Sequence, residues 1–136
     1  MVIQLLADVN VEGHVARVAA LMQTDYWREL WDYLDIRRHT FQDANLSPNN
    51  TDAHVWKVCQ EQQFYLLTNN RNDDGPDSLE ATIRTHNAAT SLPVFTFSDA
   101  DRIYQSKDYV DRVVESLFDQ LLRIDTLRGT GRLYLP

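Results

Sequence analysis

The sequence predicts a single α/β domain in which helices accompany a mostly parallel sheet of four or five strands. Short apolar runs of strand length alternate along the chain with longer segments whose apolar residues recur at helical spacing. The length of 136 residues, with 43% hydrophobic and 24% charged residues, is that of one ordinary globular domain. We therefore expect one domain over residues 1–136.

The first two strands and the two helices between them follow from the apolar pattern. Residues 2–7 form a short apolar run, interrupted only by Gln4, whose length suits a buried strand. Apolar residues then recur at helical spacing over residues 11–22 and again over residues 26–34, which predicts two helices. Residues 36–41 alternate in the manner of a second strand.

The middle of the chain continues the alternation of helix and strand. A turn at residues 47–50 precedes a predicted helix over residues 51–62, and a third strand follows at residues 64–68. The polar loop of residues 69–75 comes directly after that strand. This order is typical of βαβ units, which form parallel sheets with right-handed crossovers.

The last part of the chain begins with a helix predicted over residues 77–87. Asp77 and Glu80 have the spacing of a capping box, so Asp77 has a structural role available to it as a helix cap. We expect a strand at residues 94–97, a short helix capped by Ser98 at residues 98–104, and a long helix with a broad apolar stripe at residues 107–124. Residues 133–135 are predicted to form an edge strand or a docking segment.

Composition limits the classes of function. The formal net charge of −7 argues against a large static nucleic-acid footprint, which needs a basic face, and by default it keeps the protein soluble. It does not exclude a nuclease, because metal-binding carboxylates are themselves a source of negative charge. Cys59 is the only cysteine, so we expect a reducing cytoplasm and a thiol packed in the core. No apolar run is long enough to cross a bilayer, so no membrane partner is expected.

Carboxylates and amides follow each predicted parallel strand. In such a sheet the loops after the strands and the starts of the helices lie at one edge, where ligands bind. We expect these side chains to project from that edge: Asp8, Asn10, Asp43, Asp52, Asn69, Asn70, Asn72, Asp73, Asp74, Asp77, Asp99 and Asp101. Oxygen ligands suit Mg²⁺, which can activate water and stabilise charge on a phosphate. The sequence therefore predicts a metal and phosphate site.

Asp8 and Asp52 are the strongest candidates, and each has a structural alternative. Asp8 ends a buried strand, where a carboxylate must be hydrogen-bonded or metal-bound. Asp52 precedes Val55, Trp56 and Cys59 by three, four and seven residues, which puts it on the core-facing stripe of its helix. The alternative for Asp52 is a first-turn carboxylate, which the helix dipole stabilises by roughly 0.3–1 kcal/mol.

Three short motifs carry a resemblance to a known family. They are Leu5-Leu6-Ala7-Asp8-Val9-Asn10, the helix start Asn50-Thr51-Asp52, and Leu66-Leu67-Thr68-Asn69-Asn70-Arg71-Asn72. In order and spacing they resemble the small PIN-like family, in which a strand ends in Asp-x-Asn, a helix opens with Ser-Asp, and a later strand ends in Thr-x-Asp-x-Asp. The resemblance covers the chain up to Gly75 and implies a three-layer PIN-like fold with helices flanking the sheet.

The resemblance also implies a function. PIN-like proteins are known as Mg²⁺- or Mn²⁺-dependent ribonucleases and often as toxins of toxin–antitoxin pairs. The implied activity is hydrolysis of RNA phosphodiesters, with an antitoxin protein and a homodimer as possible partners. Asp8 and Asp52 would be catalytic metal ligands, and Asn10 would position the substrate. A phosphatase on a similar sheet is a lesser alternative, because it needs a second aspartate where Asn10 stands.

The chain departs from the family at Asn70 and Asn72, where the family has two aspartates. An amide oxygen can ligate a metal but brings no negative charge, so cation binding should weaken. In the leading hypothesis Asn70 is catalytic and ligates the metal, and Asp73 or Asp77 (or Asp74) supplies the missing charge. The alternative is a module that has kept the fold, has lost catalysis, and binds a protein or a nucleic acid.

Two further features have open interpretations. Arg71 either contacts a substrate phosphate in a bidentate manner or forms a salt bridge with Asp73 or Asp74. The aromatic residues of segment 26–34 either pack within the monomer or lie in a dimer interface.

Overall fold

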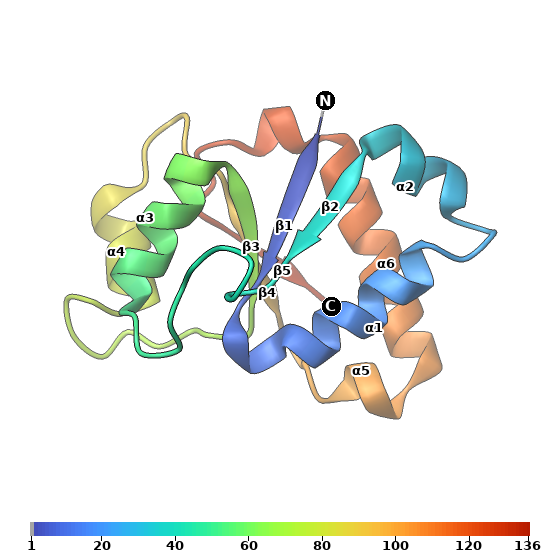
Figure 1. The fold of residues 1–136 in the computed structure, drawn as a ribbon, viewed down its shortest axis with the longest axis horizontal. Helices are drawn as coiled ribbons and strands as arrows, with labels where there is room; N and C mark the ends of the chain where they lie inside the picture. The colour runs from blue at the N-terminus through green and yellow to red at the C-terminus, as the bar shows by residue number, and fades with distance from the viewer. Residues whose placement is uncertain (1) are drawn as a thin grey trace.

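Five parallel strands form the central sheet in the computed structural model, which describes residues 2–136 (Figure 1). The strands are β1 (Ile3–Ala7), β2 (Ile36–His39), β3 (Phe64–Thr68), β4 (Val94–Phe97) and β5 (Arg132–Leu135). Their order across the sheet is β2-β1-β3-β4-β5, and every pairing is parallel. The predicted α/β fold with a parallel sheet flanked by helices is therefore confirmed.

Helices cover both faces of the sheet. They are η1 (Val9–Val11), α1 (Glu12–Met22), α2 (Arg28–Leu34), α3 (Asp52–Gln62), α4 (Leu79–His86), α5 (Arg102–Gln105), α6 (Lys107–Leu122) and η2 (Ile124–Leu127). Figure 1 shows α3 and α4 on one side of the sheet and α1, α2, α5 and α6 on the other. Within residues 2–136, no helix has the length and apolar character needed to span a membrane.

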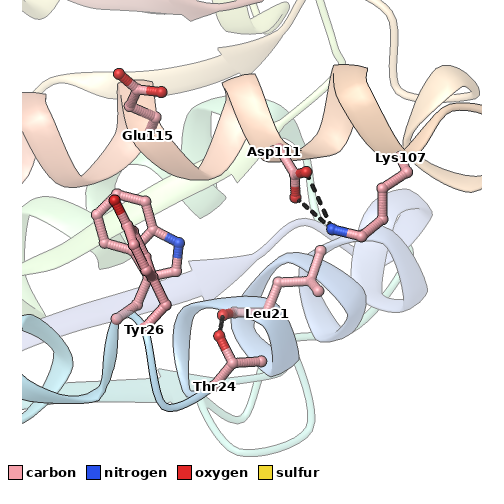
Figure 2. Close-up of a pocket in the computed structure, with 7 residues that line it drawn as sticks. Leu21, Thr24, Tyr26, Lys107, Asp111 and Glu115 are labelled. Carbon is pink, nitrogen blue, oxygen red and sulfur yellow. Dashed lines mark hydrogen bonds and ion pairs between the residues drawn. The ribbon is translucent and has the colours of Figure 1, made fainter.

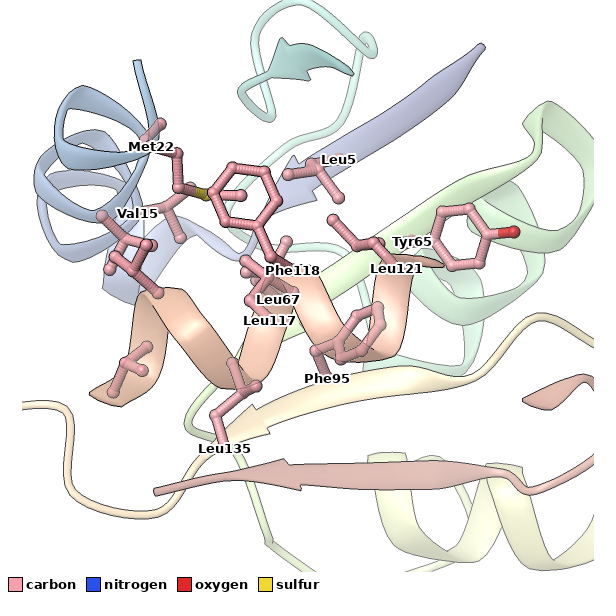
Figure 3. Packing of buried hydrophobic residues seen from close by; sticks show 14 of the residues in the cluster. Leu5, Val15, Met22, Tyr65, Leu67, Phe95, Leu117, Phe118, Leu121 and Leu135 are labelled. Atoms are coloured by element: carbon pink, nitrogen blue, oxygen red, sulfur yellow. The ribbon is translucent and has the colours of Figure 1, made fainter. Parts of the chain in front are cut away.

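The two faces of β1 contribute to two separate hydrophobic cores. Successive strand residues point to opposite faces, so Leu5 packs in the larger core with α1 and α6, and Leu6 packs in the smaller core with α3 and α4. Figure 3 shows the larger core, in which Phe95 of β4 and Phe118 of α6 are almost fully buried. The continuous apolar runs of the sequence reflect strands that are covered on both faces.

Serine and threonine side chains define where three helices begin. Thr51 Oγ1 accepts from His54 N over 3.1 Å, so the helix predicted from residue 51 begins one residue later, at Asp52. Ser106 caps α6 in the same way. These caps satisfy backbone N–H groups that have no partner within the helix.

Two predicted caps are wrong. Ser78, not Asp77, caps α4, because Ser78 Oγ accepts from Ala81 N over 3.2 Å, and the helix begins at Leu79. Ser98 is not a cap either. Its hydroxyl donates to the backbone oxygen of Leu135 over 2.6 Å, and the short helix starts only at Arg102. At α4 the local hydrogen bond of Ser78 defines the helix start, whereas at α5 the tertiary contact with Leu135 takes the Ser98 hydroxyl and no side chain caps the helix.

The C-terminal segment forms an edge strand, which was one of its two predicted roles. β5 pairs with β4, and Val94 N donates to Gly131 O over 2.9 Å at the start of the pairing. Gly131 has a φ of +82°, and a Cβ there would lie 3.1 Å from Ile83 Cγ2. Only glycine makes this turn without strain, so the predicted turn before β5 is confirmed.

Candidate functional site

Strand order reverses between β1 and β3, because the chain goes from β1 outward to β2 and then crosses back to β3, β4 and β5. Ligands of parallel α/β sheets bind beyond the carboxyl ends of the strands at such a reversal. Ala7 is in register with Leu67, so the two strands end side by side. The backbone N–H of Asp8 continues this pairing by donating to Leu67 O over 2.9 Å. Asp8 therefore stands at the reversal itself.

Each carboxylate oxygen of Asp8 accepts one hydrogen bond. Oδ1 accepts from the backbone N–H of Val9 over 2.8 Å, and Oδ2 accepts from the hydroxyl of Thr68 over 2.7 Å. The same hydroxyl accepts from the backbone N–H of Asn70 over 2.9 Å. Thr68 thus ties the acid after β1 to the loop after β3. The lone pairs that remain on Asp8 stay available to a ligand.

Asp52 is the first residue of α3 and joins three segments of the chain. Its Oδ2 accepts from Asn70 Nδ2 over 2.9 Å and from the backbone N–H of Leu79 over 3.1 Å. Leu79 begins α4, so this carboxylate also satisfies a free donor at a helix start. Oδ1 accepts no hydrogen bond from the residues that the structure describes. One oxygen of Asp52 is therefore structural, and the other is free.

Asp8 and Asp52 meet in a narrow cleft of about 90 Å³, as the sequence predicted they would. Its polar lining consists of Asp8, Asn10, Asn50, Asp52 and Asn70. The apolar lining consists of Val9, Phe41, Pro48, Val55, Leu66 and Leu79. Polar groups that converge on a partly apolar floor are typical of small binding sites.

The electrostatics of the cleft disfavour a second negative charge. Burial raises the pKa of the Asp8 carboxyl above its ordinary value, and the negative charges of Asp52 and Glu12 raise it further. Hydrogen bonds from Thr68 and Val9 lower the pKa and offset only part of this rise. A proton or a cation at Asp8 would relieve the repulsion.

Asn70 presents its amide nitrogen to Asp52. Its amide oxygen faces the other way and accepts from Asn72 N over 2.8 Å. To serve as the oxygen ligand that the sequence predicted, the amide must turn and give up the hydrogen bond from Asn72. Asn70 is therefore brought into the cleft as predicted, but in an orientation that donates a hydrogen bond to Asp52 rather than one that offers an oxygen.

The other acids of the same loop lie outside the cleft. The carboxylate of Asp73 pairs with Arg84 over 2.9 Å, and Asp77 is exposed. Neither lines the cleft. Asp43 is also used elsewhere, because it accepts from the backbone N–H of Thr40 over 2.8 Å within its own turn.

Arg71 turns away from the cleft as well. It lines a separate polar hollow of about 160 Å³, together with Asn69, Ser98, Asp99 and Asp101 from the loops after β3 and β4. The salt bridge with Asp73 or Asp74, one of the two alternatives for Arg71, is not found among residues 2–136, and Asp73 is paired with Arg84 instead. Asn10, by contrast, lines the cleft, so of the two predicted substrate-positioning residues only Asn10 is beside Asp8.

Two residues near the cleft were missed in the sequence. Glu12 is the first residue of α1, four residues after Asp8, and its Oε2 accepts from Phe41 N over 3.2 Å. Asp8 lies before that helix, so helical spacing gave no signal for Glu12. Thr68 is fully buried at the end of β3, and its sign in the sequence was the threonine of the motif that carries the resemblance.

Arg132 holds the Asn70 loop of the cleft in place through hydrogen bonds from β5. Its side chain is only 6% exposed, and its Nη1 donates to the backbone oxygen of Asn70 over 2.9 Å and to Thr96 Oγ1 over 2.7 Å. Nε donates to Glu80 over 3.1 Å. Nη2 lies 3.0 Å from the same Glu80 oxygen and makes no hydrogen bond of its own with the described residues. Nothing in the local sequence predicts these contacts, because they depend on how β5 pairs with β4.

The donor set determines which metal site is possible. Residues 2–136 contain no group of three or more His, Cys, Asp or Glu side chains that could hold a metal ion. The cleft offers the carboxylates of Asp8 and Asp52 with neutral oxygens beside them. Mg²⁺ is often held by one or two carboxylates together with substrate phosphates. The residues therefore fit a cation that is bound jointly with a phosphate, rather than one held by protein ligands alone.

A larger hollow lies away from these acids, between the α1–α2 segment and α6 (Figure 2). Its volume is about 590 Å³, Tyr26 on its wall is 83% exposed, and Lys107 pairs with Asp111 over 2.9 Å. Trp27 stacks on Phe118 with ring centroids 4.8 Å apart. Packing within the monomer therefore accounts for Trp27, whereas Tyr26 remains at the surface.

Comparison with known proteins adds nothing to the fold and the geometry: no protein-family model, no curated protein and no solved structure matches this chain. What is established is the class, a parallel α/β protein with an acidic cleft where its strand order reverses.

Proposed function

We propose that this chain is a metal-dependent endoribonuclease of the PIN-like type, which hydrolyses RNA phosphodiesters in the cleft of Asp8 and Asp52. The observation that carries the proposal is the convergence of these two carboxylates at the reversal of strand order. The three-layer parallel α/β architecture agrees with the fold that the sequence resemblance implies.

Asp8 and Asp52 would hold Mg²⁺ or Mn²⁺. When bound, such a cation would activate water and stabilise charge on the phosphate. Thr68 fixes the Asp8 carboxylate through the 2.7 Å hydrogen bond, which keeps its free lone pairs directed into the cleft. Asn10 offers an amide at the cleft wall that can donate to a phosphate oxygen.

The modest charge of the site has a consequence for affinity. With two carboxylates in the cleft, a bound cation would complete its shell with water, and a charged phosphate oxygen of the substrate would replace one of these waters and strengthen binding. We therefore expect weak binding of Mn²⁺ alone and tighter binding with a non-cleavable RNA analogue. Titration calorimetry with and without a 2′-O-methyl oligonucleotide measures the difference.

The central test is RNA cleavage with Mg²⁺ or Mn²⁺. Wild type should cleave, and Asp8→Asn should lose at least about a hundredfold in rate, as loss of a metal's charge stabilisation implies. Asp77→Asn is the control, because Asp77 was also a predicted metal ligand but is exposed and lies outside the cleft. Cleavage by neither wild type nor Asp8→Asn, or equal cleavage by both, rejects the mechanism.

A second candidate is a non-catalytic PIN-like module that binds a protein or a nucleic acid. It is favoured by the hydrogen bond from Asn70 to Asp52, which occupies a carboxylate oxygen with a protein donor in place of a metal. If wild type shows no Mn²⁺ binding even with the RNA analogue present, this candidate replaces the enzyme. One-site Mn²⁺ binding that Asp8→Asn abolishes favours the enzyme.

The resemblance extends to an antitoxin protein and a homodimer as partners, and the single cysteine favours a cytoplasmic location. Tyr26 is the most exposed large hydrophobic side chain near the hollow of Figure 2, so a homodimer contact belongs there. Light scattering of wild type and Tyr26→Ser tests this. A dimer that the substitution does not weaken rejects that surface.

A further inference from the structure

A groove runs between α3 and α4 on the outer side of the helix pair, which lies side by side in Figure 1. Its lining comes from Ala53, His54, Trp56 and Lys57 of α3 and from Thr82 and His86 of α4. The volume is about 630 Å³. Ligand pockets commonly measure about 300–1,000 Å³, so the groove has room for a small ligand or for part of a polymer.

The charge of this groove is opposite to that of the chain as a whole. The formal net charge is −7, yet no aspartate or glutamate is among the lining residues. The lining charge is that of Lys57, with His54 and His86 as further nitrogen donors. The groove therefore suits an anionic partner better than most of this surface does.

Besides Asp52, which precedes Ala53, two acids lie near the groove without lining it. Glu61 Oε1 is 4.0 Å from Lys57 Nζ, with the two side chains 59% and 73% exposed, which is a weak and solvated contact. Asp77 lies near the other end, where its backbone oxygen accepts from Ala53 N over 3.3 Å. Lys57 is thus free to exchange Glu61 for a phosphate.

The groove also contains two aromatic rings. The indole of Trp56 and the imidazole of His86 have centroids 6.3 Å apart and planes inclined by 34°. Trp56 is 8% exposed and forms the floor, while His86 is exposed on the wall. Aromatic rings beside basic groups are the combination that holds single-stranded nucleic acid, because every base has a face that can stack.

The groove continues from the cleft of Asp8 and Asp52. Asp52 lines the cleft, and the next residue, Ala53, lines the groove. On α4, Leu79 lines the cleft, and Thr82, one helical turn further, lines the groove. The starts of the two helices are joined by hydrogen bonds from Leu79 N to Asp52 Oδ2 and from Ala53 N to Asp77 O, so a strand that leaves the cleft would pass over these starts to reach the groove.

We propose that the α3–α4 groove binds single-stranded RNA and holds the nucleotide next to the phosphodiester in the cleft. This inference rests on the proposed ribonuclease function. Lys57 contacts a phosphate, and the exposed imidazole of His86, with the buried Trp56 beneath it, packs against a base. The ring pair favours RNA over an acidic protein segment, which has no bases to stack.

The test measures RNA binding in EDTA, so that binding is separated from metal-dependent cleavage. Fluorescence anisotropy of a labelled ten-nucleotide single-stranded RNA is recorded with full-length wild type, Lys57→Glu and His86→Ala. Lys107→Glu is the matched control, because Lys107 is the only other lysine in the sequence. Like Lys57, it has an acid one helical turn later, since Lys107 Nζ lies 2.9 Å from Asp111 Oδ1. Circular dichroism confirms that each variant is folded.

We expect Lys57→Glu to weaken RNA binding about tenfold. The slope of the logarithm of RNA affinity against the logarithm of salt concentration should fall by about one phosphate contact. Lys107→Glu should bind RNA as wild type does. His86→Ala should weaken binding several-fold. No RNA binding by wild type, equal losses from both lysine variants, or equally tight binding of a glutamate-rich peptide of matched charge overturns the inference. RNA binding through Lys57 without cleavage rejects the enzyme and keeps the groove. RNA cleavage by wild type together with unchanged RNA binding by Lys57→Glu keeps the enzyme and rejects the groove.

Discussion

The side-chain amide of Asn70 donates from Nδ2 to Asp52 Oδ2 over 2.9 Å, where a metal-binding site of this geometry would place a cation or a third carboxylate. The amide oxygen is already engaged by Asn72 N over 2.8 Å, so the orientation of the amide is fixed from both ends. Asp52 Oδ2 thereby has a hydrogen-bond donor from the β3 loop without a metal. The identity of residue 70 therefore controls the charge of the site.

Asn70→Asp should increase metal affinity and lower stability without metal. The substitution replaces a hydrogen-bond donor with a like charge beside Asp52, which costs about 1–3 kcal/mol of unfolding free energy in chelator. A third carboxylate should raise Mn²⁺ affinity at least about tenfold. Calorimetry and urea unfolding measure the two effects.

Asn72→Asp is the matched control for that variant. Asn72 is exposed, lies outside the cleft, and uses its side-chain oxygen to accept from Asp74 N over 2.9 Å. We expect its Mn²⁺ affinity to stay within about twofold of wild type, as for an exposed and screened charge. If both variants bind Mn²⁺ alike, the effect of residue 70 is general electrostatics and not ligation.

Asp8→Asn should stabilise the metal-free protein at neutral pH. Burial raises the pKa of Asp8 above its ordinary value of 3.8, and the charge of Asp52 adds to the rise. The folded state therefore disfavours the ionised form, and stability falls as the pH rises from the unfolded pKa through the folded one. Asparagine removes this loss, so we expect a gain of about 0.5–2 kcal/mol at pH 7 that vanishes near pH 3.

Thermal unfolding over a range of pH tests both this variant and Asp43→Asn. Asp43→Asn should change stability at neutral pH in the opposite direction to Asp8→Asn. Hydrogen bonds from the backbone N–H and the hydroxyl of Thr40 lower the pKa of Asp43. Its contribution is present above the unfolded pKa and is lost as the pH falls through the folded one. Asp43→Asn should therefore be less stable than wild type at pH 7 and equal to it in acid. The same pH dependence in both variants would contradict the assignment of the two shifts.

Cys59 should be unreactive in the folded protein. Burial, together with the negative charge of Asp8, raises the pKa of its thiol to about 12, so the thiolate needed for reaction is scarce at pH 8. We expect alkylation by iodoacetamide to be at least about a hundredfold slower in buffer than in urea. Rapid labelling of the native protein at pH 8 would mean that α3 opens locally.

Most of the fold could be predicted because a parallel sheet imposes a simple pattern on the sequence. The strands at residues 64–68 and 94–97 have the predicted bounds, since each is a continuous apolar run covered on both faces. Ends of helices were less certain. The helix predicted over residues 107–124 stops at Leu122, and a short 3₁₀ helix follows at Ile124–Leu127, a change of hydrogen bonding that spacing alone does not reveal.

The candidate site could be predicted in part for the same reason. Asp8 and Asp52 meet because loops after parallel strands share one edge. The loop after β3 could not be predicted at side-chain level. In it, Asn70 and Asn72 each accept a backbone N–H two residues ahead, and these local turns carry Asp73 outward to Arg84.

Arg132 should matter more to stability than any other ion-paired side chain in residues 2–136. Arg132→Met leaves the backbone oxygen of Asn70 and the hydroxyl of buried Thr96 without a donor, and Glu80 without its partner. We expect a loss of about 2–4 kcal/mol in urea unfolding. Arg84→Met is the matched control, because Arg84 is 61% exposed in its pair and should change stability little.

A double-mutant cycle separates the ion pair from the other contacts of Arg132. If the pair with Glu80 carries the loss, Arg132→Met with Glu80→Met should recover more than half of it, because no unpaired charge is left. If the contacts to Asn70 and Thr96 carry it, the double variant should be as unstable as Arg132→Met alone. Equal stability of Arg132→Met and Arg84→Met would contradict both outcomes and remove Arg132 as the support of the Asn70 loop.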